Sequence, residues 1–285
     1  MKRRQFCRGA VAASMLAAAP WLSGCERKTA APGATPAPDA KTADTSLRAV
    51  SLNGSEIELE KAAIRELGEA LQGEVVLSGH PQYDSVRALW NGMHDKRPAL
   101  IARCASSEDA SKAVTFAREH DLLVAVRGGG HSWPGNSSCD DGLMIDLSPI
   151  NAVRFDSALR RAYAVGGALL NALDTAALEY GLVTTAGVVS HTGVGGYTLG
   201  GGFGRLNRKH GLTIDNLRSA EIITADGEIR RASANTEVGL FWALRGGGGT
   251  FGVVTEFDSE LVPFERYCVS GMRGWPVGQA REVRD

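Results

Sequence analysis

The sequence lacks an excess of charge of either sign. Its 31 Lys and Arg residues nearly balance its 32 Asp and Glu residues, which gives a net charge of −1 and an isoelectric point of about 6.6. A protein that binds nucleic acid through the phosphates carries a basic surface. The composition therefore gives no reason to expect a nucleic-acid partner.

Several nucleotide and metal signatures are also absent. No GxxxxGK[ST] segment occurs, which excludes a P-loop. No two cysteines have CxxC spacing, so we expect no zinc site and no other metal site. The apolar stretch near the N-terminus, residues 10–22, is too short and too rich in alanine for a good membrane span.

Glycine is what the sequence has in quantity. The chain holds 35 glycines without the regular spacing of collagen, and they concentrate in residues 128–130, 193–204 and 246–252. Glycine has no side chain, so a ligand can approach its backbone closely. Glycine loops also direct backbone N–H groups into a concavity, where they hold a pyrophosphate without a lysine. We expect the three clusters to line one long cofactor, although a tight turn would explain any one of them alone.

The first 25 residues are typical of an export signal. Residues 2–6 (KRRQF) form a twin-arginine pattern, an apolar stretch follows, and residues 22–25 (LSGC) resemble a lipobox. This pattern predicts export by the twin-arginine route to the periplasm or cell envelope, with membrane attachment through a lipid anchor on Cys25. An ordinary signal peptide with an incidental cysteine is the alternative. Residues 26–46 are rich in Ala, Pro and Thr and predict a flexible linker.

Three cysteines remain outside the signal. They are Cys104, Cys139 and Cys268. One pair could form a disulfide in an oxidising compartment, and the sequence leaves the pairing open.

The rest of the chain mixes helical and extended patterns. Residues 47–97 contain one helical stretch, at 58–71, and predict an N-terminal extension. A strand, a capped helix and a second strand follow over residues 99–127 and predict a βαβ unit. The further expected elements are strands at 143–147, 152–155, 162–165 and 251–261, helices at 168–180 and 238–244, and a hairpin with an Asp-Gly turn over 221–232. This mixture predicts an α+β fold rather than a doubly wound sheet.

One GxGxxG pattern, at Gly247, Gly249 and Gly252, stands in the wrong context for a Rossmann fold. The Rossmann version follows a strand and opens a helix. Here a helical pattern precedes the glycines and a strand pattern follows them. We therefore reject a Rossmann site.

Several long motifs occur together in one order along the chain. They are RGGGHSW at 127–133, TGVGGYTLGGGFG at 192–204, KHGLTIDN at 209–216 and FWALRGGGGTFGVV at 241–254, with WNGM at 90–93 ahead of them. In these motifs the sequence resembles flavoproteins of the vanillyl-alcohol-oxidase type, and more closely the branch of berberine-bridge-enzyme-like and 6-hydroxynicotine-oxidase-like proteins. The resemblance covers roughly residues 75–265. It implies that residues 98–265 form a PCMH-type FAD-binding domain made of two α/β subdomains that enclose the cofactor.

The resemblance also implies which residues contact FAD. They are Arg127, Gly128, Gly129, Gly130, His131, Ser132, Gly193, Gly195, Gly196, Thr198, Gly200, Gly201, Gly202, Gly204 and Val254. In the family, the histidine at the position of His131 is bonded covalently to the 8α-methyl carbon of the flavin. Without the resemblance, His131 would be read as a residue that caps a turn or binds a phosphate.

Some positions depart from the family pattern. Some members carry a second covalent link from a cysteine, and Val189 stands at that position, so the resemblance implies one link only. Many two-link members have a histidine where this chain has Tyr197, whose role is therefore not carried over. His191 is as easily structural as catalytic, and His210 is expected in a turn. We identify no catalytic base.

The C-terminus departs further from the family. Members have a second domain that covers the flavin and binds the substrate, and residues 266–285 read as the start of a truncated version of it. We expect an FAD-dependent oxidoreductase that oxidises an alcohol or amine carbon of a small molecule by hydride transfer to the flavin, with O2 or another electron acceptor. An inactive FAD-binding fragment and a noncovalent flavin reductase of the same fold are the alternatives.

Overall fold

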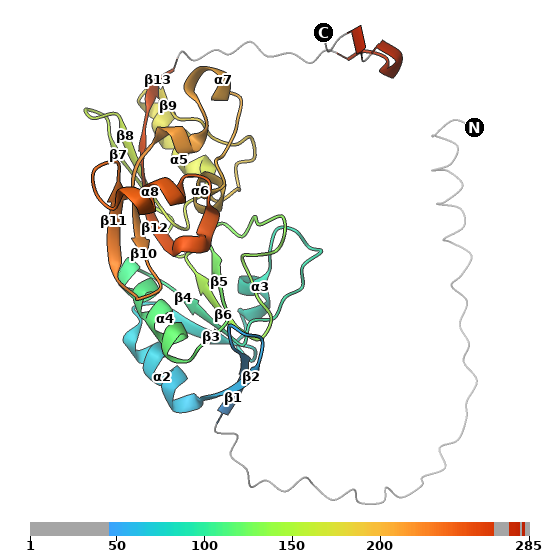
Figure 1. Ribbon diagram of the computed structural model, residues 1–285, viewed down its shortest axis with the longest axis vertical. Coiled ribbons are helices and arrows are strands. Elements are labelled where there is room, and N and C mark those ends of the chain that lie inside the picture. The colour runs from blue at the N-terminus through green and yellow to red at the C-terminus, as the bar shows by residue number, and fades with distance from the viewer. Residues whose placement is uncertain (1–45, 265–273, 280, 283–285) are drawn as a thin grey trace, which may run out of the picture. The chain divides into compact units, whose positions relative to one another are not determined.

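The computed structural model describes residues 46–264, 274–279 and 281–282 (Figure 1). The predicted export signal and nearly all of the predicted linker lie outside the described residues, as does much of the expected C-terminal segment. In the described part of the chain, no helix has the length and apolar character needed to cross a membrane.

The first subdomain is built on a four-stranded sheet in the order β3-β4-β6-β5. Its strands are β3 (Glu74–Leu77), β4 (Leu100–Arg103), β5 (Val124–Arg127) and β6 (Leu143–Asp146). β4 and β5 both run parallel to β6, which lies between them, whereas β3 is antiparallel to β4. The two central strands, β4 and β6, are short apolar runs whose residues are almost all buried. The predicted βαβ unit is present, with β6 inserted between its two strands.

Helix α4 (Ser107–Glu119) connects β4 to β5, and its N-terminus is capped as predicted. The Ser106 hydroxyl accepts a hydrogen bond from the Asp109 amide at 3.2 Å. The buried Asp109 carboxylate accepts further bonds from the amides of Gln72, Gly73 and Ala105, at 2.8–3.0 Å. These bonds join the N-terminal extension to the first subdomain.

The N-terminal extension contains more strand than predicted. β1 (Ser46–Val50) and β2 (Glu56–Glu60) form an antiparallel hairpin, and α2 (Lys61–Ala70) follows directly. The segment 56–60 alternates charged and apolar residues, a period that suits a strand, so the helix begins later than the expected residue 58. β3 and the short α3 (Tyr83–Arg87) complete the extension. Because β3 is the edge strand of the first sheet, the extension is part of the first subdomain.

The second subdomain is built on a five-stranded antiparallel sheet in the order β11-β10-β12-β8-β7. Its strands are β7 (Val153–Asp156), β8 (Arg161–Val165), β10 (Leu217–Ile223), β11 (Ile229–Ser233) and β12 (Val253–Glu260). The predicted Asp-Gly turn joins β10 to β11. The fully buried Phe257 of β12 packs in the core of this subdomain.

Helices and short elements complete the second subdomain. They are α5 (Leu170–Glu179), α6 (Val194–Leu199), α7 (Asn207–His210), α8 (Val238–Leu244), η1 (Thr213–Asn216), η2 (Gly248–Phe251) and the paired strands β9 (Leu182–Val183) and β13 (Val262–Pro263); a short turn, η3 (Val277–Gln279), follows farther along the chain. In Figure 1 the first sheet lies in the lower part and the second sheet in the upper part. Helix α4 contacts strands of both sheets. The two α/β subdomains of the expected α+β fold are confirmed.

Cys104 and Cys139 are both free thiols in this fold. Both are buried, and burial raises the pKa of Cys104 to about 12 and that of Cys139 to about 11. They are therefore protonated at neutral pH. Cys268 lies outside the described residues.

Candidate functional site

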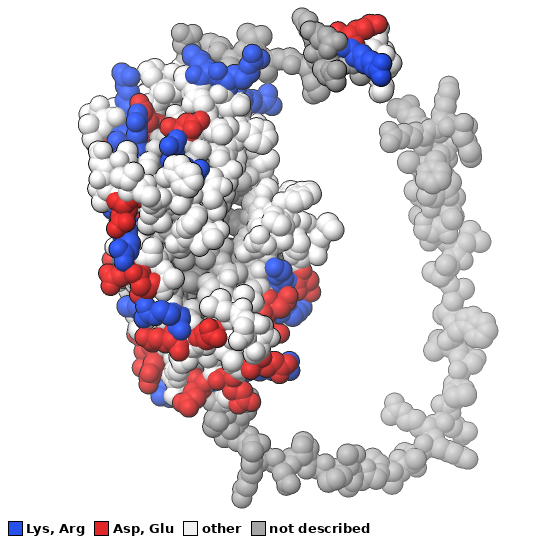
Figure 2. Space-filling view, in the orientation of Figure 1, with Lys and Arg blue, Asp and Glu red and all other residues white. Residues whose placement is uncertain are grey.

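A cavity of about 740 Å³ is lined by residues of both subdomains, and all three glycine clusters contribute to it. Its volume is within the range of sites that hold small molecules and cofactors. Among the residues that the structure describes, no Asp, Glu, Lys or Arg lines it. Figure 2 agrees with this, because the charged side chains lie mostly along the edges of that face and the hollow is bordered by other residues.

Nine of the predicted FAD contacts line this cavity: Gly128, Gly129, Gly130, His131, Ser132, Gly193, Gly195, Gly196 and Val254. The other six, Arg127, Thr198, Gly200, Gly201, Gly202 and Gly204, lie outside the lining. The contacts of all fifteen residues with FAD stay predictions.

The loop after β5 consists of glycines because it touches other backbone segments. A Cβ atom added to Gly128 would lie 2.7 Å from the Gly166 carbonyl oxygen, and one added to Gly129 would lie 2.4 Å from the Gly193 Cα. Real Cβ atoms are not found at such distances. The first two glycine clusters therefore meet backbone to backbone in the lining of the cavity.

Backbone amides in this loop are free to bind a ligand. The N–H groups of Gly128, Gly129 and Gly130 donate no hydrogen bond within the described residues. Buried amides are normally paired, so free ones beside a cavity are suited to an anionic ligand. Within the described residues no basic side chain lines the cavity, so these amides are the N–H donors that it offers to an anionic group.

Helix α6 was not predicted from the sequence. Gly193 is its N-cap residue, and Gly195 and Gly196 fall in its first turn, where a helix cannot satisfy its own N–H groups. In the sequence, the only pattern that indicates this helix is the four-residue spacing of Val194 and Thr198, which are both buried. The surrounding glycines obscured it.

The third glycine cluster confirms that the GxGxxG pattern is not a Rossmann loop. Helix α8 precedes it and β12 follows it. Gly252 has a φ of 147° and lies against the Ile223 backbone, where a Cβ would be 2.2 Å from the carbonyl oxygen. Gly249 and Gly252 line the cavity from this side.

Arg127 lies next to the first glycine loop and pairs with a buried carboxylate. Its Nη1 donates to the Asp146 Oδ1 at 3.1 Å, and Arg103 donates to Oδ2 of the same carboxylate at 3.3 Å. The Asp146 side chain is 1 % exposed. A Cβ on Gly130, whose φ is 66°, would lie 3.0 Å from the Arg127 Nε. Arg127 thus contacts the loop through its guanidinium, and Asp146 neutralises its charge.

Asp146 was missed by the sequence analysis. It also accepts bonds from the Ser148 amide at 3.0 Å and the Ser148 hydroxyl at 2.9 Å. Its only signal was an acidic residue at the end of an apolar strand.

His131 lies at one side of the cavity in a group of aromatic rings. The Trp90 ring stacks on its imidazole, with centroids 4.2 Å apart and planes inclined by 16°. The His191 ring lies 5.0 Å from it, and Trp133 lies 6.2 Å from Trp90. The His131 Nε2 atom is buried and has no hydrogen-bond partner.

Burial lowers the pKa of His131, and repulsion from His191 lowers it further, while a bond to its own backbone acts in the opposite direction. The neutral form of the imidazole is therefore favoured. A neutral imidazole nitrogen is a nucleophile.

Residues 200–216 form the turns beside the cavity. The Tyr197 hydroxyl donates to the Phe203 carbonyl at 2.6 Å, and burial raises the pKa of Tyr197. Asn216 donates to the carbonyls of His210 and Leu212 at 3.0 and 2.8 Å. His210, expected in a turn, is the last residue of the four-residue helix α7, and Asn216 holds the turn that follows it.

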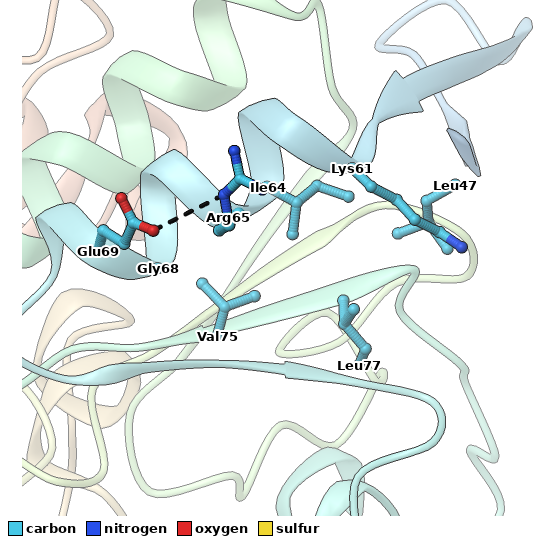
Figure 3. A pocket seen from close by; sticks show the side chains of 8 residues that line it. All are labelled: Leu47, Lys61, Ile64, Arg65, Gly68, Glu69, Val75 and Leu77. Carbon is cyan, nitrogen blue, oxygen red and sulfur yellow. Dashed lines mark ion pairs between the residues drawn. The ribbon is translucent and has the colours of Figure 1, made fainter. Parts of the chain in front are cut away.

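A second, smaller pocket of about 430 Å³ lies in the N-terminal extension (Figure 3). Leu47, Ile64, Val75 and Leu77 line it, and an ion pair between Arg65 and Glu69 stands at its rim, with 3.7 Å between the charged atoms. It contains no glycine loop and none of the predicted FAD contacts.

Comparison with known proteins identifies this arrangement. Residues 98–233 match the family model of an FAD binding domain. The chain is 37% identical over 206 residues to (R)-6-hydroxynicotine oxidase of Paenarthrobacter nicotinovorans, an alignment that covers 72% of this chain and 45% of that protein.

Two solved structures share the fold. A glucooligosaccharide oxidase of Acremonium strictum, whose FAD is described as 6-S-cysteinyl, 8α-N1-histidyl FAD, is 34% identical with a TM-score of 0.65 and covers 71% of this chain and 43% of that one. A berberine-bridge-enzyme-like protein of Physcomitrella patens is 26% identical with a TM-score of 0.67 and covers 70% of this chain and 44% of that one. The chain spans less than half the length of these relatives.

Proposed function

Because the chain contains an FAD-binding domain of the family that these oxidases share, we propose that it is the cofactor-binding part of an FAD-dependent oxidoreductase. The observation that carries this proposal is the cavity, which all three glycine clusters line and which offers free backbone amides. Bound FAD would supply two-electron oxidation of the substrate.

Some residues of the chain would bind FAD through its phosphates, and one would attach it covalently. The amides of Gly128, Gly129 and Gly130 would hold the phosphates, and the first turn of α6 would add the amides of Gly195 and Gly196. His131 would form one covalent bond to the flavin. Three properties of His131 suit it to this bond. Its side chain is half-buried, its neutral form is favoured, and one of its ring nitrogens has no hydrogen-bond partner. Withdrawal of electrons from the flavin ring by this bond would favour oxidation of substrate.

The expected single link differs from the doubly linked FAD of the glucooligosaccharide oxidase. A 6-S-cysteinyl link needs a thiol. Val189 stands at the expected position, and both described cysteines are buried outside the cavity lining.

Covalent attachment is tested by acid denaturation of the full chain after incubation with FAD. We expect yellow flavin fluorescence to stay on the polypeptide band of the wild-type chain and to be lost in His131→Ala. The matched control is His80→Gln, a histidine in the turn after β3 and outside the cavity, which should keep the fluorescence. Release of all flavin from the wild-type chain, or retention in His131→Ala, would contradict the link.

The substrate we propose is a small molecule that is oxidised at an alcohol or amine carbon, with O2 or another acceptor reoxidising the flavin. The names of two relatives support this class. One is named for 6-hydroxynicotine, which is an amine, and the other for glucooligosaccharide, which is an alcohol. The alternatives are an FAD-binding chain without turnover and a noncovalent flavin reductase. Covalent flavin without turnover on a panel of alcohols, sugars and amines would favour the first alternative, and noncovalent flavin reduced by NADH or NADPH would favour the second.

We also propose that the chain is exported and anchored to a membrane by a lipid on Cys25. The twin-arginine pattern and the LSGC segment support this. In a bacterial host, the wild-type chain should incorporate labelled palmitate and sediment with membranes. Cys25→Ala should do neither, and Cys7→Ala is the matched control. Equal labelling of Cys25→Ala and wild type would contradict the anchor.

A further inference from the structure

His131 has a second imidazole beside it. The His191 ring lies 5.0 Å from the His131 ring and 6.2 Å from Trp90, whose ring stacks on His131. His191 comes from the loop before α6, and His131 comes from the loop after β5. The contact between Gly129 and Gly193 brings these two loops together.

The distance suits transfer of a proton between the two rings. Heavy atoms of a proton donor and acceptor need to approach within hydrogen-bond distance, directly or through one water. A small rotation of either ring, or one water, bridges a centroid separation of 5.0 Å. His191 is also exposed, so a proton that it accepts can pass on to solvent.

The cavity offers no comparable proton acceptor. Within the described residues, no carboxylate and no lysine line it. Tyr197 is the other ionisable lining side chain besides His131, and its hydroxyl is committed as a donor to the Phe203 carbonyl at 2.6 Å. The nearest candidate is therefore the second imidazole.

We propose that His191 is the proton acceptor for covalent attachment of FAD to His131. This inference rests on the covalent link of the proposed function. His191 takes the N–H proton of the His131 ring while the ring nitrogen forms its bond, and Trp90 holds the plane of the His131 ring during the step.

The chemistry balances with dioxygen as the oxidant. The lone pair of one imidazole nitrogen of His131 would form the bond to the 8α-methyl carbon of the flavin. The other ring nitrogen would lose its proton, which His191 accepts, and the methyl carbon would lose one proton, while the two electrons of its C–H bond pass into the flavin ring. Dioxygen takes the two electrons and two protons and becomes hydrogen peroxide, so one peroxide is released for each covalent bond.

The test follows covalent incorporation rather than turnover. The full chain is produced without riboflavin, mixed with FAD, quenched in acid at intervals, and scored by flavin fluorescence on the polypeptide band. We expect His191→Gln to bind FAD with a Kd within about threefold of wild type and to incorporate it about 100-fold more slowly, which is the usual size of general acid–base effects. The control His80→Gln should behave as wild type.

Chemical rescue separates proton transfer from a structural role. Imidazole added to His191→Ala should restore incorporation, with a dependence on the concentration of neutral imidazole, and should release one peroxide per bond. Incorporation by His191→Gln at the wild-type rate, or a slow His191→Ala that imidazole does not rescue, would overturn the proposal. A wild-type chain that never retains flavin in acid would instead overturn the covalent link itself, so the two failures are distinguishable.

Discussion

Replacement of Gly193 by alanine should separate the two glycine loops that meet in the lining of the cavity. The added Cβ would lie 2.5 Å from the Gly129 nitrogen and 2.7 Å from the Gly129 Cα. Since ordinary contact starts at 3.4 Å, the two backbones have to move apart by about 1 Å. Both partners are backbone atoms, so no side-chain rotation relieves the overlap.

The loss of stability in Gly193→Ala can be compared with the effect of Gly196→Ala in the first turn of the same helix. Overpacking of this kind costs about 1–3 kcal/mol, and the loss of glycine flexibility in the unfolded chain returns about 0.4–1 kcal/mol. The net destabilisation for Gly193→Ala is about 1–2 kcal/mol, or roughly 2–8 °C in Tm. A Cβ on Gly196, in the first turn of α6, meets nothing within 4 Å. Gly196→Ala should therefore raise the stability by about 0.5–1 kcal/mol.

The assay is thermal and urea unfolding of the chain without added FAD, followed by covalent incorporation. Gly193→Ala should unfold earlier and incorporate FAD more slowly, because His131 and His191 lie on the two loops that are forced apart. A Tm of Gly193→Ala at or above that of wild type would refute the backbone contact. Equal shifts in both variants would show that glycine content, rather than the approach of the loops, decides the outcome.

Three further predictions concern charged and aromatic side chains. Asp146→Ala should lose about 3–5 kcal/mol in urea unfolding, because the partly buried guanidinium groups of Arg127 and Arg103 lose the buried carboxylate that they share. Glu74→Ala, at a half-exposed ion pair, should lose less than about 1 kcal/mol. Burial raises the pKa of Asp174 to about 6, so the folded chain binds the proton more tightly than the unfolded chain and its stability falls as the pH rises through 4 to 6. Asp174→Asn should be more stable than wild type by about 1 kcal/mol at pH 8 and equal to it near pH 4, whereas a larger advantage at acid pH would contradict this sign. Trp90→Ala should slow covalent incorporation about 2–10-fold by loss of the stacked ring and Trp90→Phe should largely restore it, so equal rates in the two variants would exclude stacking as the cause.

The sequence predicts an element correctly where the period of its apolar residues and the residues at its ends indicate the same type of structure. The βαβ segment, the Asp-Gly hairpin and helix α8 each carry such a pattern, and the structure contains all three. α6 was missed because glycine is a poor helix former, so the segment reads as a loop. Burial of Val194, Thr198 and Leu199 against the rest of the subdomain overrides that propensity.

The sequence predicts the backbone of the site but not which side chains pair beside it. A run of glycines indicates that another group approaches the backbone closely, and in the structure Gly129 and Gly193 make such a contact. Asp146 gave no comparable signal. Its pairing depends on the strand order β4-β6-β5, which places Arg103 and Arg127 on either side of it, and a pattern along one strand does not specify which strands are its neighbours.

The pairing of Arg127 with Asp146 also explains how a cavity for an anionic cofactor can lack charge. A free guanidinium beside the loop would attract phosphate from any direction and would itself need solvent. Here the Asp146 carboxylate forms an ion pair with the Arg127 guanidinium, and the guanidinium occupies the space next to Gly130. In the proposed function, recognition would then depend on the backbone amides, whose positions are constrained by the contact between Gly129 and Gly193. Such amides select a ligand by the geometry of its phosphates rather than by net charge, and the same uncharged surroundings keep the imidazole of His131 neutral and nucleophilic.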